Sequence, residues 1–220
     1  MRREELIIKP LVIIGAGGFG REVAWLVSDI NNALSKPQWD ILGFVDDSVV
    51  ETAEGYSVLG GIDWLNKHAA SFFVVCAIGN PSTRKTVIDS ISSSSISFGT
   101  LIHPSVKMSK YVTVLEGSII CSDTIITTNV KIGRHCILNL GTRIGHDSVL
   151  DDYSSLMPGV NIAGDVVLGK GSYLGLNASV INKVRVGDWT TVGAGATVVS
   201  DLPEKCVAVG IPAKPIKFVS

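Results

Sequence analysis

The sequence predicts a chain in two parts, an α/β half domain followed by an all-β parallel β-helix. An aliphatic residue or Met recurs at every sixth position from Ile102 to Val198 without a break. Before residue 99, strand-like apolar runs alternate instead with a glycine-rich turn and helical segments. A period of six fits neither the 3.6-residue helix nor the alternation of hairpin sheets, and it is typical of stacked hexapeptide coils.

Three hexads would make one triangular coil of the β-helix. The aliphatic residue of each hexad fills the inside, and a small or β-branched residue four positions later fits where the chain turns a corner. Seventeen hexads then form between five and six coils, which at about 4.8 Å per layer give a prism roughly 27 Å long. Past Val198 the period ends, and we expect prolines in the tail to close the open edge of the last coil.

Residues 1–99 predict a small Rossmann-like domain, and residues 100–220 are assigned to the β-helix. A buried strand over residues 6–14 leads into a GxGxxG turn, and a helix follows over residues 21–33. Such a turn lets backbone N–H groups approach a phosphate at the start of a helix. A tight connection that binds no ligand is the alternative. The candidate nucleotide-binding residues of the turn are Gly15, Gly17 and Gly18.

Two further apolar strands, over residues 41–45 and 72–78, end in polar loops. Open α/β sheets bind ligands at the edge where such loops gather. Fewer than 100 residues precede the repeat, too few for a full dinucleotide domain, so we expect half a Rossmann unit that holds a mononucleotide or the nucleotide of a nucleotide sugar. For the two aspartates, a solvated strand-end pair is the alternative. The candidates in these loops are Asp46, Asp47, Gly79, Asn80 and Arg84.

Composition restricts the class of partner. Hydrophobic residues make up 46% of the chain and charged residues 18%, and the net charge is −1. With no dense run of Lys or Arg, a nucleic-acid or anionic membrane surface is disfavoured, so we expect a small-molecule partner. The first 14 residues lack the features of a signal peptide, and no apolar run is long enough to span a bilayer. Four widely spaced cysteines without a CxxC pair predict buried free thiols and a reducing cytoplasm.

Four segments together resemble one family. They are GAGGFGREV at residues 15–23, AIGNPSTR at 77–84, the unbroken hexad repeat, and VGIPAKP at 209–215. This combination resembles the hexapeptide-repeat acyltransferases that act on nucleotide-linked amino sugars, and also those described as sialic acid O-acetyltransferase-like. The resemblance implies a left-handed β-helix and a homotrimer with active sites between neighbouring prisms. Acetyl-CoA would lie along the groove between two prisms, and the nucleotide sugar would bridge the N-terminal domain and the helix.

The resemblance also implies catalytic residues. The family's pattern of Asn, a few residues, then Ile-x-His-Glu/Asp matches Asn139, His146 and Asp147. His146 would be the general base, Asp147 its orienting carboxylate, and Asn139 a substrate-binding residue. Ser155 stands where members often carry a second histidine that contacts the acyl group or sugar, so this departure affects that contact.

The residues themselves add a geometric condition. His146 lies two positions after the inward Ile144, so its side chain should point off the prism. Adjacent residues on a straight strand diverge, so a pairing of His146 with Asp147 requires a corner there. An imidazole exchanges protons near neutral pH, which suits a general base. The chain has no Ser-x-Gly elbow or activated Cys, which favours direct attack on the thioester.

Small residues mark the expected acetyl-CoA site. A backbone N–H at Gly164, one coil after His146, is the candidate donor to the tetrahedral oxyanion. Small residues in the last coils would let a pantetheine arm lie against the wall, and the basic tail could meet the phosphates. No metal is expected, because His103, His135 and His146 have no metal-ligand spacing. The cofactor-binding candidates are Ser155, Gly164, Gly175, Gly193, Gly195, Pro212 and Lys214.

The sequence thus predicts acetyl-CoA-dependent N-acetylation of the 4-amino group of a sugar linked to a nucleoside diphosphate. One alternative is O-acetylation of a free or nucleotide-linked sugar of the sialic acid type. Another, from a different class, is a non-catalytic β-helix scaffold or a carbonic-anhydrase-like relative. Which nucleotide, which sugar and which acyl chain length are involved is left open by the sequence.

Overall fold

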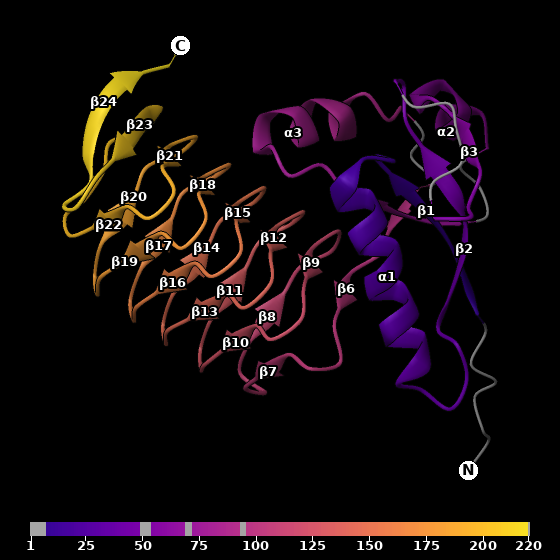
Figure 1. Ribbon diagram of the computed structural model, residues 1–220, viewed down its shortest axis with the longest axis horizontal. Helices are drawn as coiled ribbons and strands as arrows, with labels where there is room; N and C mark the ends of the chain where they lie inside the picture. The colour runs from indigo at the N-terminus through magenta and orange to yellow at the C-terminus, as the bar shows by residue number, and fades with distance from the viewer. Residues whose placement is uncertain (1–7, 49–53, 69–71, 93–95, 220) are drawn as a thin grey trace.

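The structure is a computed structural model that describes residues 8–48, 54–68, 72–92 and 96–219. Figure 1 shows an α/β part beside an elongated prism, with the C-terminus at the far end of that prism. This arrangement confirms the predicted fold class. Within the described residues, none of the helices is both long and apolar enough to cross a membrane.

The α/β part is a parallel sheet with strand order β3-β2-β1-β4-β5. Alternate residues of β1 pack on opposite sides: Leu11 and Ile13 join the core that contains α1, and Val12 and Ile14 join the core behind the sheet. Burial of both faces is usual for parallel strands. The elements are β1 (Lys9–Ile14), α1 (Gly18–Asn32), β2 (Trp39–Val45), β3 (Val58–Gly60), α2 (Ile62–His68), β4 (Phe73–Cys76), α3 (Pro81–Asp89) and β5 (Ser97–Phe98).

Some predicted boundaries differ from the structure. The first helix starts at Gly18 rather than at residue 21, because Gly17 takes the N-cap position without a side-chain cap. The strand predicted over residues 72–78 ends at Cys76, and β3 was not predicted. Residues 6 and 7 of the predicted first strand lie outside the described residues.

The prism consists of two-residue strands in three parallel sheets, one along each side of the triangle. We call these sides the first, second and third faces. The first face holds β6 (Leu101–Ile102), β9 (Ile119–Ile120), β12 (Ile137–Leu138), β15 (Ser155–Leu156), β18 (Tyr173–Leu174) and β21 (Thr191–Val192). The second holds β7 (Lys107–Met108), β10 (Ile125–Ile126), β13 (Arg143–Ile144), β16 (Asn161–Ile162), β19 (Ser179–Val180) and β22 (Thr197–Val198). The third holds β8 (Thr113–Val114), β11 (Lys131–Ile132), β14 (Val149–Leu150), β17 (Val167–Leu168) and β20 (Arg185–Val186).

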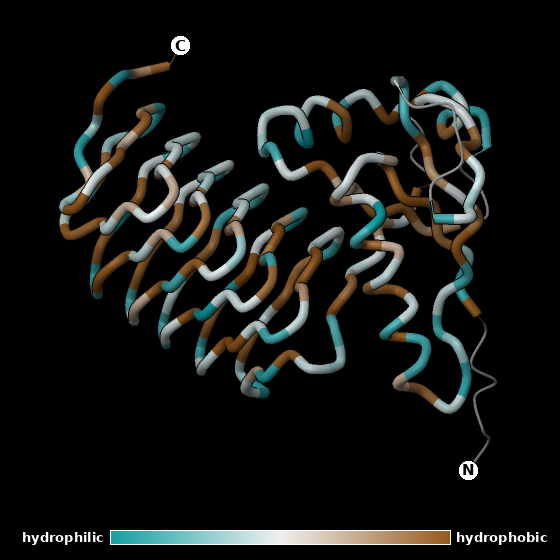
Figure 2. Tube along the Cα trace, viewed as in Figure 1, coloured by the Kyte–Doolittle hydropathy of each residue, from teal (hydrophilic) through white to brown (hydrophobic). Residues whose placement is uncertain are grey.

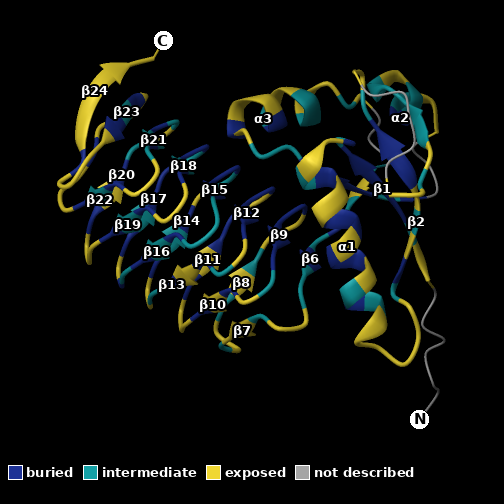
Figure 3. Ribbon diagram, in the orientation of Figure 1, coloured by how far each residue is buried: buried dark blue, intermediate teal, exposed yellow. Residues whose placement is uncertain are grey.

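Each coil is 18 residues long, since Ile126 pairs with Ile144 and Ile144 with Ile162. The second residue of nearly every prism strand is buried, which confirms the hexad prediction. Figures 2 and 3 show hydrophobic and buried residues recurring from coil to coil along the prism. Hydroxyls at the small positions satisfy backbone carbonyls at the corners: Ser118 Oγ, for example, donates to the Gly133 carbonyl at 2.9 Å. The hexad therefore specifies both the core and the corners.

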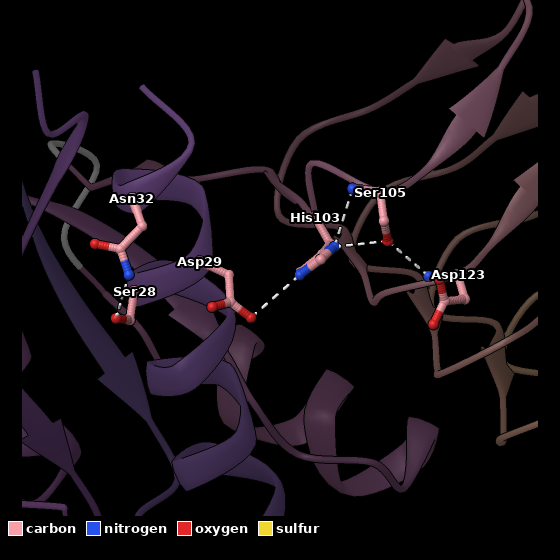
Figure 4. A network of polar contacts seen from close by, with 6 residues as sticks. All are labelled: Ser28, Asp29, Asn32, His103, Ser105 and Asp123. Atoms are coloured by element: carbon pink, nitrogen blue, oxygen red, sulfur yellow. Dashed lines mark hydrogen bonds and ion pairs between the residues drawn. The ribbon is translucent and has the colours of Figure 1, made fainter. Parts of the chain in front are cut away.

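The α/β part covers the first face of the prism at its first coils. Outward-facing Leu101, Ile119 and Ile137 on this face are buried in the core that contains α1. A polar contact lies beside them: Figure 4 shows Asp29 of α1 directed at His103, with His103 Nε2 3.2 Å from Asp29 Oδ2. The two parts thus share an apolar core as well as a polar contact.

The tail closes the far end of the prism. Strand β23 (Cys206–Val209) pairs parallel with β21, and β24 (Lys214–Phe218) folds back antiparallel on β23. The tail therefore covers the open edge of the last coil, as expected from the sequence.

Candidate active site

His146 and Asp147 form a hydrogen-bonded pair at the corner between the second and third faces. His146 Nδ1 lies 2.7 Å from Asp147 Oδ2, and both side chains are about half exposed, at 58% and 50%. Asp147 has a φ of 60°, a left-handed conformation that Asp adopts more readily than most residues. The chain turns at this residue, and the turn brings the adjacent side chains together.

Asn129, one coil before Asp147, holds the other carboxylate oxygen. Its Nδ2 donates to Asp147 Oδ1 at 2.6 Å. This hydrogen bond, with the smaller contribution of His146, lowers the pKa of Asp147 below its ordinary value. An ionised Asp147 accepts a hydrogen bond from His146 Nδ1–H, which leaves the Nε2 lone pair free.

Gly164 lies one coil after His146, beneath its imidazole. A Cβ at Gly164 would stand 2.5 Å from His146 Nε2, so any side chain would displace the ring. Within the described part of the chain, the Gly164 N–H has no hydrogen-bond acceptor. A free N–H beside a free Nε2 is a suitable arrangement for acyl transfer, because the first can stabilise an oxyanion and the second can accept a proton.

The glycine turn and the strand ends of the α/β part form a separate cavity of about 280 Å³. We call it the sheet-edge cavity. Asp46 organises this edge: its Oδ2 accepts from the Ala16 N–H at 2.9 Å and its Oδ1 from the Ser48 N–H at 2.8 Å. Asp47 Oδ1 accepts from the Ile62 N–H at 3.1 Å. Among the sequence candidates, the cavity is lined by Gly15, Asp46 and Asp47.

The other two glycines of the turn lie outside this lining. Gly18 borders a second cavity of about 500 Å³ on the outer side of α1, together with Arg21, Trp25 and Tyr56. Gly17 is exposed and is the N-cap residue of α1. The predicted phosphate-binding turn is thus shared between two surfaces.

Gly79 and Asn80 line a groove of about 680 Å³ between the start of α3 and the first face. We call it the first-face groove. Tyr173, Trp189 and Lys205 form much of its prism side. The Asn80 side chain caps α3 by accepting from the Thr83 N–H at 3.0 Å. Sequence reasoning did not identify the two aromatic residues as site residues, because they occupy ordinary corner and strand positions of the repeat.

The structure places Arg84 and Ser155 differently from the sequence prediction. Arg84, expected to contact substrate, is 0% exposed. Its guanidinium is directed into the interface between the two parts, where Nη2 donates to Ser155 Oγ at 2.8 Å. Ser155, expected at the cofactor, is also 0% exposed, and its hydroxyl donates to the Gly79 carbonyl at 2.8 Å. Both residues therefore connect the parts internally.

The remaining candidates lie on other corners of the same prism. Asn139 is 7% exposed at the corner between the first and second faces, and its Oδ1 accepts from the Leu140 N–H at 2.7 Å. Gly175, Gly193 and Gly195 lie at later turns of that corner. Close packing explains the first two, because a Cβ would stand 2.6 Å from Ala194 N and 2.8 Å from Val209 Cγ1 respectively. The tail residues Pro212 and Lys214 are exposed.

The other prism histidines contribute to structure. His135 is 4% exposed, stacks on Tyr153 at 5.2 Å and meets the edge of Phe98. Burial, aided by Arg84, lowers its pKa to about 4. His103 pairs with Asp29 between the two parts. The described residues contain no group of three or more His, Cys, Asp or Glu side chains placed to hold a metal ion.

Comparisons with known proteins agree with this architecture. The PglD N-terminal domain family model matches residues 10–91. The acetyltransferase domain of PglB from Neisseria gonorrhoeae FA1090, solved with acetyl coenzyme A, is 28% identical, with a TM-score of 0.87 over 96% of this chain and 100% of that one. A variant of perosamine N-acetyltransferase from Caulobacter crescentus, solved with CoA and GDP-perosamine, is 29% identical. Its TM-score is 0.85, and the match covers 96% of this chain and 98% of that one. WeeI from Acinetobacter baumannii AYE is 30% identical. Its TM-score is 0.83, and the match covers 94% of this chain and 99% of that one.

The fold and these full-length similarities define the class of protein. The chain belongs to the hexapeptide-repeat acyltransferase family, and its prism is a left-handed β-helix. The sequence prediction of an acetyl-CoA-dependent sugar acyltransferase is confirmed at this level.

Proposed function

We propose that the protein N-acetylates the 4-amino group of a nucleoside-diphosphate amino sugar by direct attack on acetyl-CoA. The observation that carries this proposal is the ordered arrangement Asn129, Asp147, His146 and Gly164 at one corner. Hydrogen bonds of 2.6 and 2.7 Å fix the imidazole. Its free nitrogen lies against Gly164, whose N–H has no acceptor within the described residues.

The proposed reaction has two steps. The sugar amine attacks the thioester carbonyl carbon, and His146 Nε2 takes the proton from the nitrogen as the C–N bond forms. The oxyanion accepts a hydrogen bond from the Gly164 N–H. As the C–S bond breaks, the imidazolium returns the proton to the departing thiolate, so CoA leaves as the thiol. Asp147 stabilises the imidazolium between these steps.

The sheet-edge cavity supports a nucleotide sugar as acceptor. It lies at the carboxyl ends of β1, β2 and β4, where parallel sheets bind nucleotides. The solved relative from Caulobacter crescentus is named as an N-acetyltransferase and was solved with GDP-perosamine. These two observations favour an amine on a nucleotide sugar over a hydroxyl of a free sugar.

We also propose a homotrimer, because within one chain the sheet-edge cavity and His146 lie on different sides of the prism. His146 lies at the corner opposite the first face, whereas the α/β part covers that first face. A neighbouring prism would bring a second chain's His146 to the nucleotide. Exposed apolar residues on the second face and its corners supply a surface for this contact, namely Ile125, Leu140, Leu176, Ile181 and Val199.

The proposed location is the cytoplasm. Cys76, Cys121, Cys136 and Cys206 are all free and buried, which suits a reducing compartment.

The test is thiol release from acetyl-CoA in the presence of UDP-, GDP- and dTDP-linked 4-amino sugars, with free sialic acid alongside. We expect one nucleotide sugar to be acetylated on nitrogen and His146→Ala to abolish the reaction. His68→Ala, which changes an exposed histidine on α2, is the matched control and should keep wild-type activity. Turnover of free sialic acid alone would replace the proposal with O-acetylation, and CoA binding without turnover of any sugar would show that the acceptor is wrong.

A further inference from the structure

One cation, Arg84, is completely buried between the α/β part and the prism. Its side chain is 0% exposed, and no carboxylate pairs with it among the described residues. Neutral oxygens surround it instead. Burial of an unpaired charge is unfavourable unless its hydrogen bonds are satisfied, so the surrounding geometry has a specific role.

The guanidinium binds both parts of the protein at once. On the α/β side, Nη1 donates to the carbonyls of Ile78 and Gly79, the latter at 3.2 Å. On the prism side, Nε donates to the His135 carbonyl at 2.9 Å, and Nη2 donates to the Tyr153 carbonyl at 2.7 Å. Ser155 Oγ closes the cluster, since it accepts from Nη2 at 2.8 Å and donates to the Gly79 carbonyl.

The loop held in this way separates the sheet-edge cavity from the first-face groove. Ile78 lines the sheet-edge cavity, and Gly79 lines the first-face groove. The Arg84 cluster holds the carbonyls of both residues. The backbone between the sheet-edge cavity and the prism is therefore held in place at these two carbonyls.

We propose that Arg84 and Ser155 are positioning residues, which hold the loop between β4 and α3 against the prism and so keep the nucleotide sugar, bound in the sheet-edge cavity, within reach of the neighbouring chain's catalytic corner. This inference rests on the proposed function. It assigns neither residue a contact with substrate or CoA.

The geometry requires arginine at this position. Arginine presents five N–H donors in a planar fork, and here the fork reaches acceptors from two domains. Lysine has a single ammonium with three donors, so it cannot hold the loop carbonyls and the prism carbonyls together. Arg84→Lys keeps the charge and removes the bridge.

The experiment compares Arg84→Lys and Ser155→Ala with Lys85→Ala, a control at the next position on α3, where the side chain makes a surface pair with Asp89. Steady-state kinetics are measured with acetyl-CoA and the nucleotide sugar that the wild type acetylates. We expect Arg84→Lys to raise the KM for the nucleotide sugar about tenfold, the effect of losing one hydrogen bond to a charged group. The KM for acetyl-CoA and the kcat should change less than about twofold.

Hydrogen exchange of the amides at residues 77–83 provides a second measurement that needs no substrate. Exchange should be faster in Arg84→Lys and Ser155→Ala than in the control. If Arg84→Lys does not fold, Ser155→Ala decides, with an expected rise of about threefold in the nucleotide-sugar KM.

Equal increases in both KM values, or an unchanged nucleotide-sugar KM despite faster exchange, would overturn the positioning role. If no nucleotide sugar is turned over by the wild type, the proposed function fails, and exchange alone then decides whether the Arg84 cluster fixes the loop. Unchanged exchange in both variants would refute it.

Discussion

Asp29 and His103 join the helix of the glycine turn to the first coil of the prism, with Oδ2 and Nε2 3.2 Å apart. The Ser105 N–H donates to His103 Nδ1 at 3.1 Å, so Nε2 is the ring nitrogen that donates a hydrogen bond to Asp29. This contact therefore needs no charge on the histidine. It supplements the apolar core beneath α1.

From this contact we expect Asp29→Ala to lower the free energy of unfolding by about 1 kcal/mol, the usual net value of one hydrogen bond. Asp29→Asn should lose less, because its amide oxygen still accepts from Nε2. Urea denaturation of the three proteins measures the difference. Equal stability of the alanine variant and the wild type would show that the contact contributes nothing.

Asp147→Asn tests the orientation of the base. Asparagine also tolerates the left-handed conformation at this corner, so the variant should fold with an unchanged melting temperature. Loss of the carboxylate leaves the imidazole tautomer unfixed, and we expect kcat to fall about 10²- to 10⁴-fold. The thiol-release assay measures kcat. A variant whose kcat is within threefold of wild type, a difference of about 0.65 kcal/mol in the activation free energy, would remove Asp147 from the mechanism.

Gly164→Ala tests the space beneath the base. Its added methyl would stand 2.5 Å from His146 Nε2, so we expect the imidazole to move and kcat to fall at least about a hundredfold. The backbone of Gly164 is not left-handed, so alanine introduces no strain there. The control is Asn182→Ala, at the same corner position one coil later. If both variants keep full activity, Gly164 does not support the site.

The buried His135 predicts a stability loss in acid. Its pKa of about 4 in the folded protein lies below the ordinary value of about 6.5. As pH falls from 6.5 to 4, the unfolded chain therefore binds the proton first, and folding loses about 3 kcal/mol. His135→Asn, which suits the positive φ of this corner, should lack that component. Free energies of unfolding at several pH values measure it, and parallel curves for the two proteins would contradict the assignment.

The proposed trimer predicts a mass in solution of three times 23.3 kDa. Ile181→Asp places a charge on an apolar side chain that is 43% exposed beside the second face. We expect this variant to dissociate and to lose activity together, because each site would need a neighbouring prism. Small-angle scattering and thiol release are measured on the same samples. An active monomer would refute a site shared between chains.

The hexad pattern predicted most of the prism, because each strand is only two residues long and its inward residue is set by local sequence. The pairing of His146 with Asp147 was expected from the family resemblance, and the corner that it required is present in the structure. Asn129 could have been found from the repeat, because it stands 18 residues before Asp147, directly one coil away.

The interface between the parts was beyond such reasoning. Arg84 and Ser155 are 71 residues apart, and no periodicity relates them, so each was assigned to a ligand instead of to the other. Asp46 was a candidate nucleotide-binding residue at a strand end, and in the structure its carboxylate holds the backbone of the glycine turn. Contacts between the repetitive prism and the non-repetitive α/β part follow no periodic pattern in the sequence.

The 18-residue coil gives the enzyme a length that can change only in fixed increments. Removing one complete coil between the α/β part and β13 would keep every face and corner in register, and it would bring the catalytic corner nearer the nucleotide cavity by about 4.8 Å. Deleting a single hexad would instead rotate His146 to a different side of the triangle. Relatives that differ by whole coils in this segment would therefore accept substrates of different reach while retaining the same chemistry.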